Sequence, residues 1–328
     1  MKGQYSVIIE NRRVRYDFTI RRNITIIRGD SATGKTQLLE MLLAFSRQNG
    51  DSGVSLKCDR RCVVLDVVNW EQNLQFLSQC IIFIDEGNAF VASEDFARAV
   101  ASSDNYFVII TRHSLPNLSY SVEEIYGIRT SSRYAGMKQT YNELYHLYGN
   151  VPPTDLPMAE QAILEDSNAG FEFYDTVLQG QLSCISAGGK TAIPGLLRRN
   201  TDEGFSLVIA DGAAFGPEME RIERLLDAGK KIALYLPESF EWNILCAGLI
   251  DDPEIAEILA HPEDHIDSTR YTSWERFFTA LLVQKTDGTY LKYSKSKLNH
   301  AYLQDKERAA ILKTMPALKA LFNPNRVL

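Results

Sequence analysis

The sequence predicts an α/β protein of two domains, each built on a mostly parallel sheet, with a helical C-terminal end. Its 328 residues are enough for two domains of ordinary size. Short apolar runs alternate with segments of helical periodicity, which is typical of βα units. Residues 151–157, VPPTDLP, carry three prolines and indicate a linker. We therefore expect a first domain over 1–150, a linker over 151–160 and a second domain over 161–328.

The first half contains several strand-like runs and one clear helix. Two of the runs are almost continuously apolar, as in parallel strands covered on both faces. A helix is expected after residue 36, where the leucines of QLLEMLLAF fall on one side. The expected strands are residues 4–10, 13–20, 23–28, 63–68, 80–85, 106–113 and 123–130.

The second half repeats a strand–helix alternation. Each expected strand ends in Gly, Pro or acidic residues before a helical segment begins. The expected strands are residues 161–166, 181–188, 205–212 and 230–238. From about residue 241 onward the chain reads mainly helical, and residues 274–282 are the clearest case.

Composition excludes several classes of protein. With 45% apolar and 23% charged residues the chain is able to build a core, which argues against disorder. The N-terminal residues do not resemble a signal peptide, and no window approaches the roughly 18 apolar residues of a membrane span. The five cysteines are few and scattered, which predicts a cytoplasmic protein. Cys58 and Cys62 lack a second ligand pair nearby, which argues against zinc.

The net charge of −7 conceals a strong segregation of charge. Residues 1–28 carry seven Lys and Arg against two Asp and Glu, and residues 285–328 carry nine against three. Residues 151–270 carry eight against twenty-two. The basic ends leave DNA open as a partner despite the acidic total. The alternative is that these segments are solvated faces, and a protein partner or self-association is equally open.

One motif stands out near the N-terminus. The pattern GxxxxGK[ST] is matched by Gly29, Asp30, Ser31, Ala32, Thr33, Gly34, Lys35 and Thr36. A buried strand precedes it and a helix follows, as in a P-loop, whose backbone N–H groups and helix N-terminus bind nucleotide phosphates. Lys35 is expected to reach the β- and γ-phosphates, and the Thr36 hydroxyl to bind Mg²⁺. The alternative is a glycine-rich turn without a ligand.

Acidic residues end the next apolar strand. Asp85 is expected to hold Mg²⁺, and Glu86 to polarise the water that attacks ATP. This pair favours an ATPase over a small-molecule kinase. His113 ends the following strand and is expected to sense the γ-phosphate, although Arg112 and His113 are equally explained as a polar strand end.

A second group of carboxylates follows strands of the second half. They are Glu165, Asp211, Glu238 and Glu241. In an open parallel sheet the carboxyl ends of the strands converge on one crevice. Gathered acids repel unless a cation or a proton lies among them, and oxygen ligands suit Mg²⁺ or Mn²⁺. The sequence therefore predicts a divalent-metal site here.

These residues resemble a TOPRIM domain, the Mg²⁺-dependent module of topoisomerases, primases and some nucleases. The family pattern is a glutamate after the first strand, matched by Glu165, and Asp-x-Asp after the third, matched only by Asp211 because residue 213 is alanine. An ATPase followed by TOPRIM resembles the overcoming-lysogenization-defect (OLD) family of ATP-driven nucleases. That resemblance implies a role in phage defence or mobile-element biology. The alternative is a Rossmann-like domain with ordinary polar strand ends.

Two functional hypotheses result. In the first, the protein binds and hydrolyses ATP, and its second domain acts on nucleic acid through a divalent metal. In the second, it is an ATP-dependent switch whose second domain is catalytically inactive and binds a protein partner. Metal-dependent cleavage of DNA separates the two.

Overall fold

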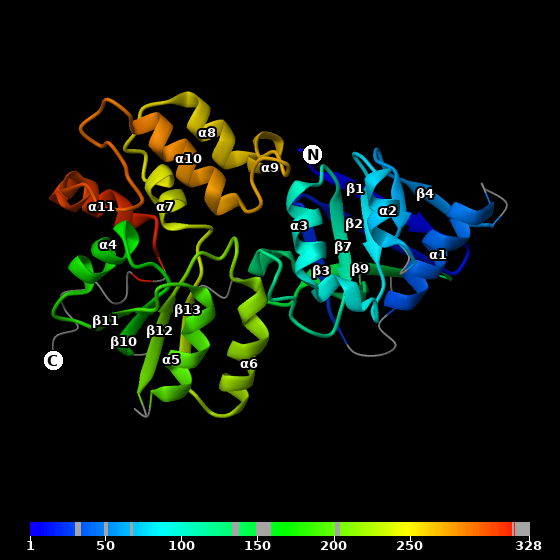
Figure 1. Cartoon of the computed structure of the whole chain (residues 1–328), viewed down its shortest axis with the longest axis horizontal. Helices are drawn as coiled ribbons and strands as arrows, with labels where there is room; N and C mark the ends of the chain where they lie inside the picture. The colour runs from blue at the N-terminus through cyan, green and yellow to red at the C-terminus, as the bar shows by residue number, and fades with distance from the viewer. Residues whose placement is uncertain are drawn as a thin grey trace. The chain divides into compact units, whose positions relative to one another are not determined.

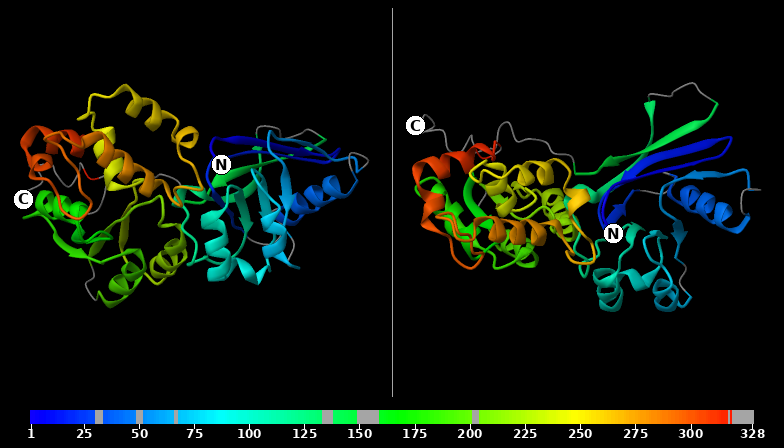
Figure 2. Two further views of the ribbon diagram at one scale, coloured as in Figure 1. Left: turned by 45° about the horizontal axis from the view of Figure 1, so that its top comes forward. Right: turned by 90° about the horizontal axis from the view of Figure 1, so that it is seen from above.

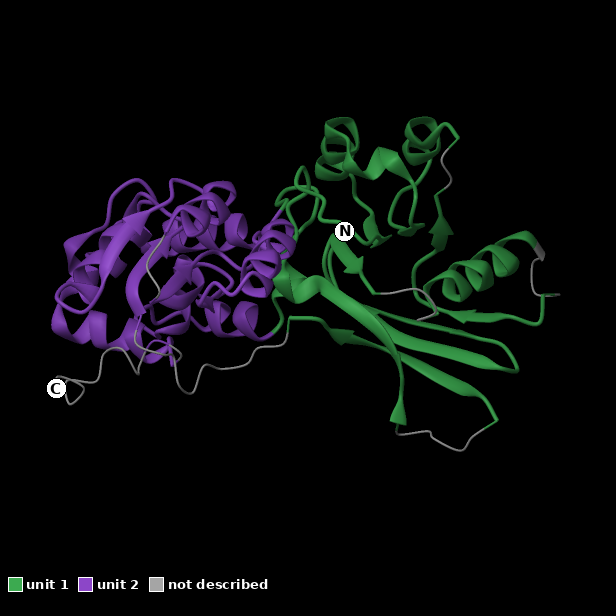
Figure 3. Ribbon diagram, turned by 90° about the horizontal axis from the view of Figure 1, so that it is seen from below, with its two compact units in different colours: residues 1–149, 261–272 green, residues 150–260, 273–328 purple. Residues whose placement is uncertain are grey.

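The computed structural model describes residues 1–29, 34–48, 52–65, 68–132, 138–148, 159–200, 204–316 and 318. The chain divides into two compact units (Figure 3). The first comprises Met1–Gly149 and His261–Thr272, and the second comprises Asn150–Ala260 and Ser273–Leu328. Each unit combines helices with a sheet, so the predicted α/β class is confirmed. None of the described helices has the length and apolar character needed to cross a membrane.

The first unit is built on a nine-stranded mixed sheet, in the order β4-β1-β2-β9-β8-β3-β7-β6-β5 (Figure 1). Its parallel part runs from β8 to β5, and antiparallel pairs join β1 to β2, β1 to β4, and β8 to β9. The strands are β1 (Tyr5–Glu10), β2 (Val14–Ile20), β3 (Ile24–Ile27), β4 (Ser55–Lys57), β5 (Cys62–Val64), β6 (Ile81–Ile84), β7 (Tyr106–Ile110), β8 (Ile125–Thr130) and β9 (Thr140–His146).

Helices cover both faces of the parallel strands, which is why β3, β6 and β7 are buried along their whole length. The helix α1 (Lys35–Gln48) inserts Leu38, Leu39 and Leu42 into a core shared with β1, β2, β6 and β7. On another side of the sheet, α3 (Glu94–Ser102) packs Phe96 edge-on against Phe107 of β7, with a ring separation of 5.9 Å. Figure 2 shows α1 well apart from α3 and its neighbour α2 (Trp70–Gln75).

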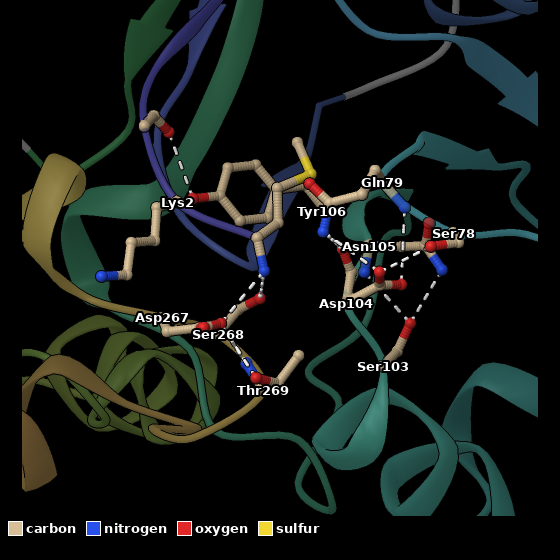
Figure 4. Close-up of polar contacts among 12 residues, drawn as sticks. Lys2, Ser78, Gln79, Ser103, Asp104, Asn105, Tyr106, Asp267, Ser268 and Thr269 are labelled. Atoms are coloured by element: carbon tan, nitrogen blue, oxygen red, sulfur yellow. Dashed lines mark hydrogen bonds and ion pairs between the residues drawn. The ribbon is translucent and has the colours of Figure 1, made fainter.

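The segment His261–Thr272, which contains α9 (Pro262–His265), is the part of the first unit that the sequence placed in the second domain. Hydrogen bonds join this segment to the N-terminal residues. The Met1 ammonium donates to Asp267 Oδ1 at 3.2 Å and to Ser268 Oγ at 2.9 Å (Figure 4). The backbone N–H of Gly3 donates to the Glu263 carbonyl at 2.7 Å. These bonds join residues far apart in sequence, so no local pattern indicates them.

The second unit has a four-stranded parallel sheet in the order β11-β10-β12-β13. The strands are β10 (Ala159–Leu164), β11 (Ser183–Ser186), β12 (Phe205–Ile209) and β13 (Ile232–Tyr235). The helices are α4 (Ala169–Leu178), α5 (Ile193–Arg199), α6 (Met219–Asp227), α7 (Phe240–Cys246), α8 (Pro253–Ala260), α10 (Trp274–Thr286) and α11 (Asp305–Lys313). Figure 1 shows α7, α8 and α10 beyond the carboxyl ends of β12 and β13.

Several expected boundaries differ from the structure. Residues 151–158 of the expected linker lie outside the described residues, while Ala159 and Glu160 already belong to β10. The strand expected at 63–68 is β5, which ends at Val64. Two strands were not expected, β4 and β9. Both lack a run of apolar residues, and long-range pairing with β1, β2 and β8 holds them in the sheet.

Candidate functional sites

The first candidate site lies at the carboxyl edge of three neighbouring strands of the first unit. The parallel strands β3 and β7 pair, and β7 pairs in parallel with β6. Gly29, Thr111 and Asp85 follow these strands closely, so all three lie at one edge of the sheet. In open α/β sheets this edge is where ligands bind. The sheet therefore gathers Gly29, Asp85 and the Thr111–His113 turn at one edge.

The two glycines of the GxxxxGK[ST] motif adopt positive φ angles. Gly29 has φ 142° and Gly34 has φ 93°, values that favour glycine. A Cβ on Gly34 would lie 2.8 Å from the hydroxyl oxygen of Tyr16. That hydroxyl donates a hydrogen bond of 2.8 Å to the Gly34 carbonyl, so β2 fixes the end of the loop.

Lys35 and Thr36 form the first turn of α1, where the helix dipole favours an anion. The Lys35 side chain is buried, with 6% exposure, and its Nζ donates to the Gly29 carbonyl across the loop. Thr36 is exposed. Asp30, Ser31, Ala32 and Thr33, also predicted to contact phosphate, lie outside the described residues.

Asp85 and Glu86 follow β6 directly. Asp85 is exposed, and its Oδ1 accepts the Glu86 backbone N–H at 2.7 Å. The Glu86 carboxylate is ion-paired with the Arg112 guanidinium, through Nε and Oε1. The structure thus brings together two strand ends that the sequence treated separately. Arg112 was considered only as a polar strand end, and its position beside His113 was the one available signal.

His113 belongs to a tight turn after β7. Its backbone N–H donates to Thr111 Oγ1 at 3.1 Å, and the Thr111 hydroxyl donates to the His113 carbonyl at 3.0 Å. The side chain is exposed at the same edge as Asp85. Its predicted contact with a γ-phosphate remains a prediction.

The second candidate site lies in the second unit, after the neighbouring strands β10 and β12. The Asp211 backbone N–H donates to Glu165 Oε2 at 3.0 Å, and the Phe240 N–H donates to Asp211 Oδ1 at 3.2 Å. Gly212 permits this arrangement, because a Cβ there would collide with the Leu236 carbonyl. The structure therefore brings Glu165 and Asp211 together.

A small cavity of about 20 Å³ opens between these strand ends, with room for about one water molecule. Glu165, Asp211 and Glu241 line it together with Lys295. Glu241 is buried in the first turn of α7, and its Oε1 accepts the Tyr293 hydroxyl at 2.9 Å. Glu238 does not line this cavity. Its backbone carbonyl accepts the Ala213 N–H at 3.3 Å.

Two lysines that the sequence did not single out lie among these carboxylates. Lys295 Nζ binds Glu275 Oε1 at 2.6 Å. Burial favours its neutral form, but the carboxylates of Glu241 and Glu275 outweigh burial and raise the pKa of Lys295. Burial lowers the pKa of Lys190, whose Nζ donates to the Ala214 carbonyl at 2.6 Å, while Glu165 opposes that change. Their distance from Glu165 along the chain explains why no motif indicated them.

The carboxylates themselves bind protons more strongly than usual. Burial raises the pKa of Glu165 to about 7, and the nearby Glu275 adds to the effect. Burial, followed by Glu275 and Glu165, raises the pKa of Asp211 well above its ordinary range. Burial in this crevice therefore disfavours the ionised forms of Glu165 and Asp211, and Lys295 places a positive charge beside them.

The residues of this crevice do not fit a divalent-metal centre as they lie. Among the described residues, no group of three or more His, Cys, Asp or Glu side chains is arranged to hold a metal ion. Asp166 also lines the cavity, but its carboxylate accepts the backbone N–H groups of Ser167, Asn168 and Gly170. Ala213 supplies no ligand, and Lys295 contributes a positive charge to the cavity.

Comparison with known protein families and with curated proteins finds no match for this chain.

Proposed function

We propose that the first unit binds Mg·ATP at the carboxyl edge of β3, β7 and β6 and hydrolyses it. The observation that carries the proposal is the juxtaposition at that edge of a glycine-bounded loop, the buried Lys35 and the strand-end acids Asp85 and Glu86. A strand, a loop and a helix in this order, as in a P-loop, suit phosphate because the backbone N–H groups and the N-terminal end of the helix dipole carry partial positive charge.

Each residue has a distinct role in this proposal. Lys35 exchanges its bond to the Gly29 carbonyl for the β- and γ-phosphates. The exposed oxygens of Thr36 and Asp85 suit Mg²⁺, which would neutralise phosphate charge when bound. Glu86 accepts a proton from the attacking water, and Arg112 orients the Glu86 carboxylate.

The test is ATP hydrolysis and thermal stabilisation by Mg·ATP. Lys35→Ala should abolish both, because it removes the cation that binds the phosphates. Lys57→Ala, which removes an exposed lysine at the end of β4, is the matched control and should behave as the wild type. The proposal fails if millimolar Mg·ATP does not stabilise the wild-type protein and the protein does not hydrolyse it.

For the second unit, we propose an ATP-dependent switch that serves a protein partner, because Lys295 lies among the carboxylates and supplies the positive charge that a metal ion would bring. Metal-dependent action on nucleic acid, the other hypothesis, is supported by the meeting of Glu165 and Asp211, although the described residues contain no group of three side chains arranged to hold a metal ion. Supercoiled plasmid incubated with the protein, ATP and Mg²⁺ or Mn²⁺ decides between them. Cleavage that is lost in Glu165→Ala, while ATP hydrolysis survives, would reject the switch.

A further inference from the structure

The turn between β4 and β5 brings two thiols against the backbone of one residue, Arg60. Cys58 follows the last residue of β4, and Cys62 is the first residue of β5. The backbone N–H of Arg60 donates to Cys58 Sγ at 3.5 Å, and Cys62 Sγ donates to the Arg60 carbonyl at 3.8 Å. Both sulfur atoms therefore contact the backbone of Arg60, within the turn that joins the two strands.

The two thiols differ chemically. Both cysteines are half-buried. Interaction with the neighbouring Cys62 thiol, aided by the Arg60 N–H and opposed by burial, lowers the pKa of Cys58 to about 7. The same interaction and burial raise the pKa of Cys62. Near neutral pH the pair is thus a thiolate beside a thiol, the combination found in reactive dithiols.

The other cysteines provide an internal contrast. Burial raises the pKa of Cys184 to about 11 and that of Cys246 to about 12. Burial also raises the pKa of Cys80, which lies before β6 and whose thiol donates to the Ser78 carbonyl at 3.2 Å. These thiols remain protonated near neutral pH, and a protonated thiol is a poor nucleophile.

We propose that Cys58 and Cys62 form a peroxide-sensitive dithiol that closes to an intramolecular disulfide. The Cys58 thiolate attacks one oxygen of a hydroperoxide. An S–O bond forms, the O–O bond breaks, and the leaving oxygen takes a proton, which gives Cys58 sulfenic acid. Cys62 sulfur then attacks Cys58 sulfur. The S–S bond forms, the S–O bond breaks, and the hydroxide leaves as water with the Cys62 proton. With hydrogen peroxide, two thiols lose two electrons and the peroxide becomes two water molecules.

The experiment uses the intact folded chain and hydrogen peroxide at sub-millimolar concentration, followed by alkylation of the remaining thiols and peptide mass spectrometry. We expect a peptide with a Cys58–Cys62 disulfide, which dithiothreitol reduces. Cys184 and Cys246 should stay reduced and therefore be recovered in alkylated form. Equal oxidation of all five cysteines, or a linkage of Cys58 to Cys80, would overturn the proposal.

Two variants separate the steps. In Cys62→Ser the reaction should stop at Cys58 sulfenic acid, which dimedone traps. In Cys58→Ser, Cys62 should stay reduced under the same conditions. The alkylation rate of Cys58 in the wild type should rise with a midpoint near pH 7, and a midpoint near that of an ordinary thiol would also count against the proposal. The wild-type results stand even if a variant fails to fold.

Discussion

The two carboxyl edges of this protein use the same strand-end chemistry in opposite ways. In the first unit, Asp85 is exposed, and Glu86 forms an ion pair with Arg112 at the protein surface. In the second, Glu165 and Asp211 are held by backbone N–H groups beside a cavity with room for about one water molecule. A strand-end carboxylate therefore indicates where a site lies, but its burial and its neighbours decide what the site accommodates.

The difference is electrostatic. Carboxylates at the surface keep their hydration, and their oxygens are available to a cation that accompanies a phosphate. Buried carboxylates cost much more to ionise, and here protons and Lys295 compensate for them. A substitution at one carboxyl edge should therefore leave the properties of the other edge unchanged.

The largest effect is expected at Glu86. Glu86→Gln keeps the shape of the side chain but removes the proton acceptor, so ATP turnover should fall about 10²–10⁴-fold while ATP still binds. Steady-state hydrolysis and a binding titration measure the two properties separately. Glu94→Gln, in an exposed turn of α3, is the control. Unchanged turnover in Glu86→Gln would assign the base elsewhere.

The second effect concerns the pH dependence of stability. The folded pKa of Glu165 is about 7, above its ordinary value of 4.5, so the folded protein holds this proton more tightly than the unfolded chain. The resulting stability is complete below pH 4.5 and is lost as the pH rises through 7, on the order of 3 kcal/mol.

Urea unfolding at pH 5 and pH 8 measures this loss. Glu165→Gln should reduce the difference between the two pH values, whereas Glu160→Gln, at an exposed position of β10, should not. Equal pH dependence in wild type and Glu165→Gln would show that Glu165 is not the group responsible.

A smaller effect is expected for Asp85→Asn. The amide removes one negative charge facing Mg²⁺, so ATP should require roughly tenfold more Mg²⁺ for the same binding, about 1.4 kcal/mol. A titration of Mg²⁺ at fixed ATP gives the shift. Asp95→Asn, exposed in α3, should show none. An identical Mg²⁺ requirement in Asp85→Asn would exclude this carboxylate from the metal site.

The smallest effect is expected for Tyr16→Phe. Its hydroxyl donates to the Gly34 carbonyl, and loss of one such hydrogen bond costs about 1 kcal/mol. The variant should bind ATP several-fold more weakly with little change in turnover once ATP is saturating. A reduced maximal rate at unchanged affinity would contradict a role limited to fixing the loop.

Local patterns allowed part of this structure to be predicted. The residues of β3, β6 and β7 and the leucines of α1 are buried in the core. Their burial gives the sequence apolar runs and a helical periodicity that can be recognised without the structure. Glu165 and Asp211 were expected to converge because parallel strands end at one edge. Lys190, Lys295 and the Arg112–Glu86 pair were not expected, because they depend on side-chain positions set by long-range packing.

β9 shows a second reason for failure. Only Asn142 of its seven residues is buried, so the strand has almost no hydrophobic alternation. Its place comes from backbone pairing with β2 and β8. Pairing partners of this kind are invisible to a single-sequence pattern.

The return of His261–Thr272 to the first unit has a consequence for protein synthesis. The N-terminus of a chain leaves the ribosome first, and domains generally fold as units as they emerge. The partners of the Met1 ammonium, Asp267 and Ser268, are made only after residues 150–260 of the second unit. The first unit is therefore synthesised first but completed late, because Met1 and Gly3 form these bonds only after most of the second unit has been translated.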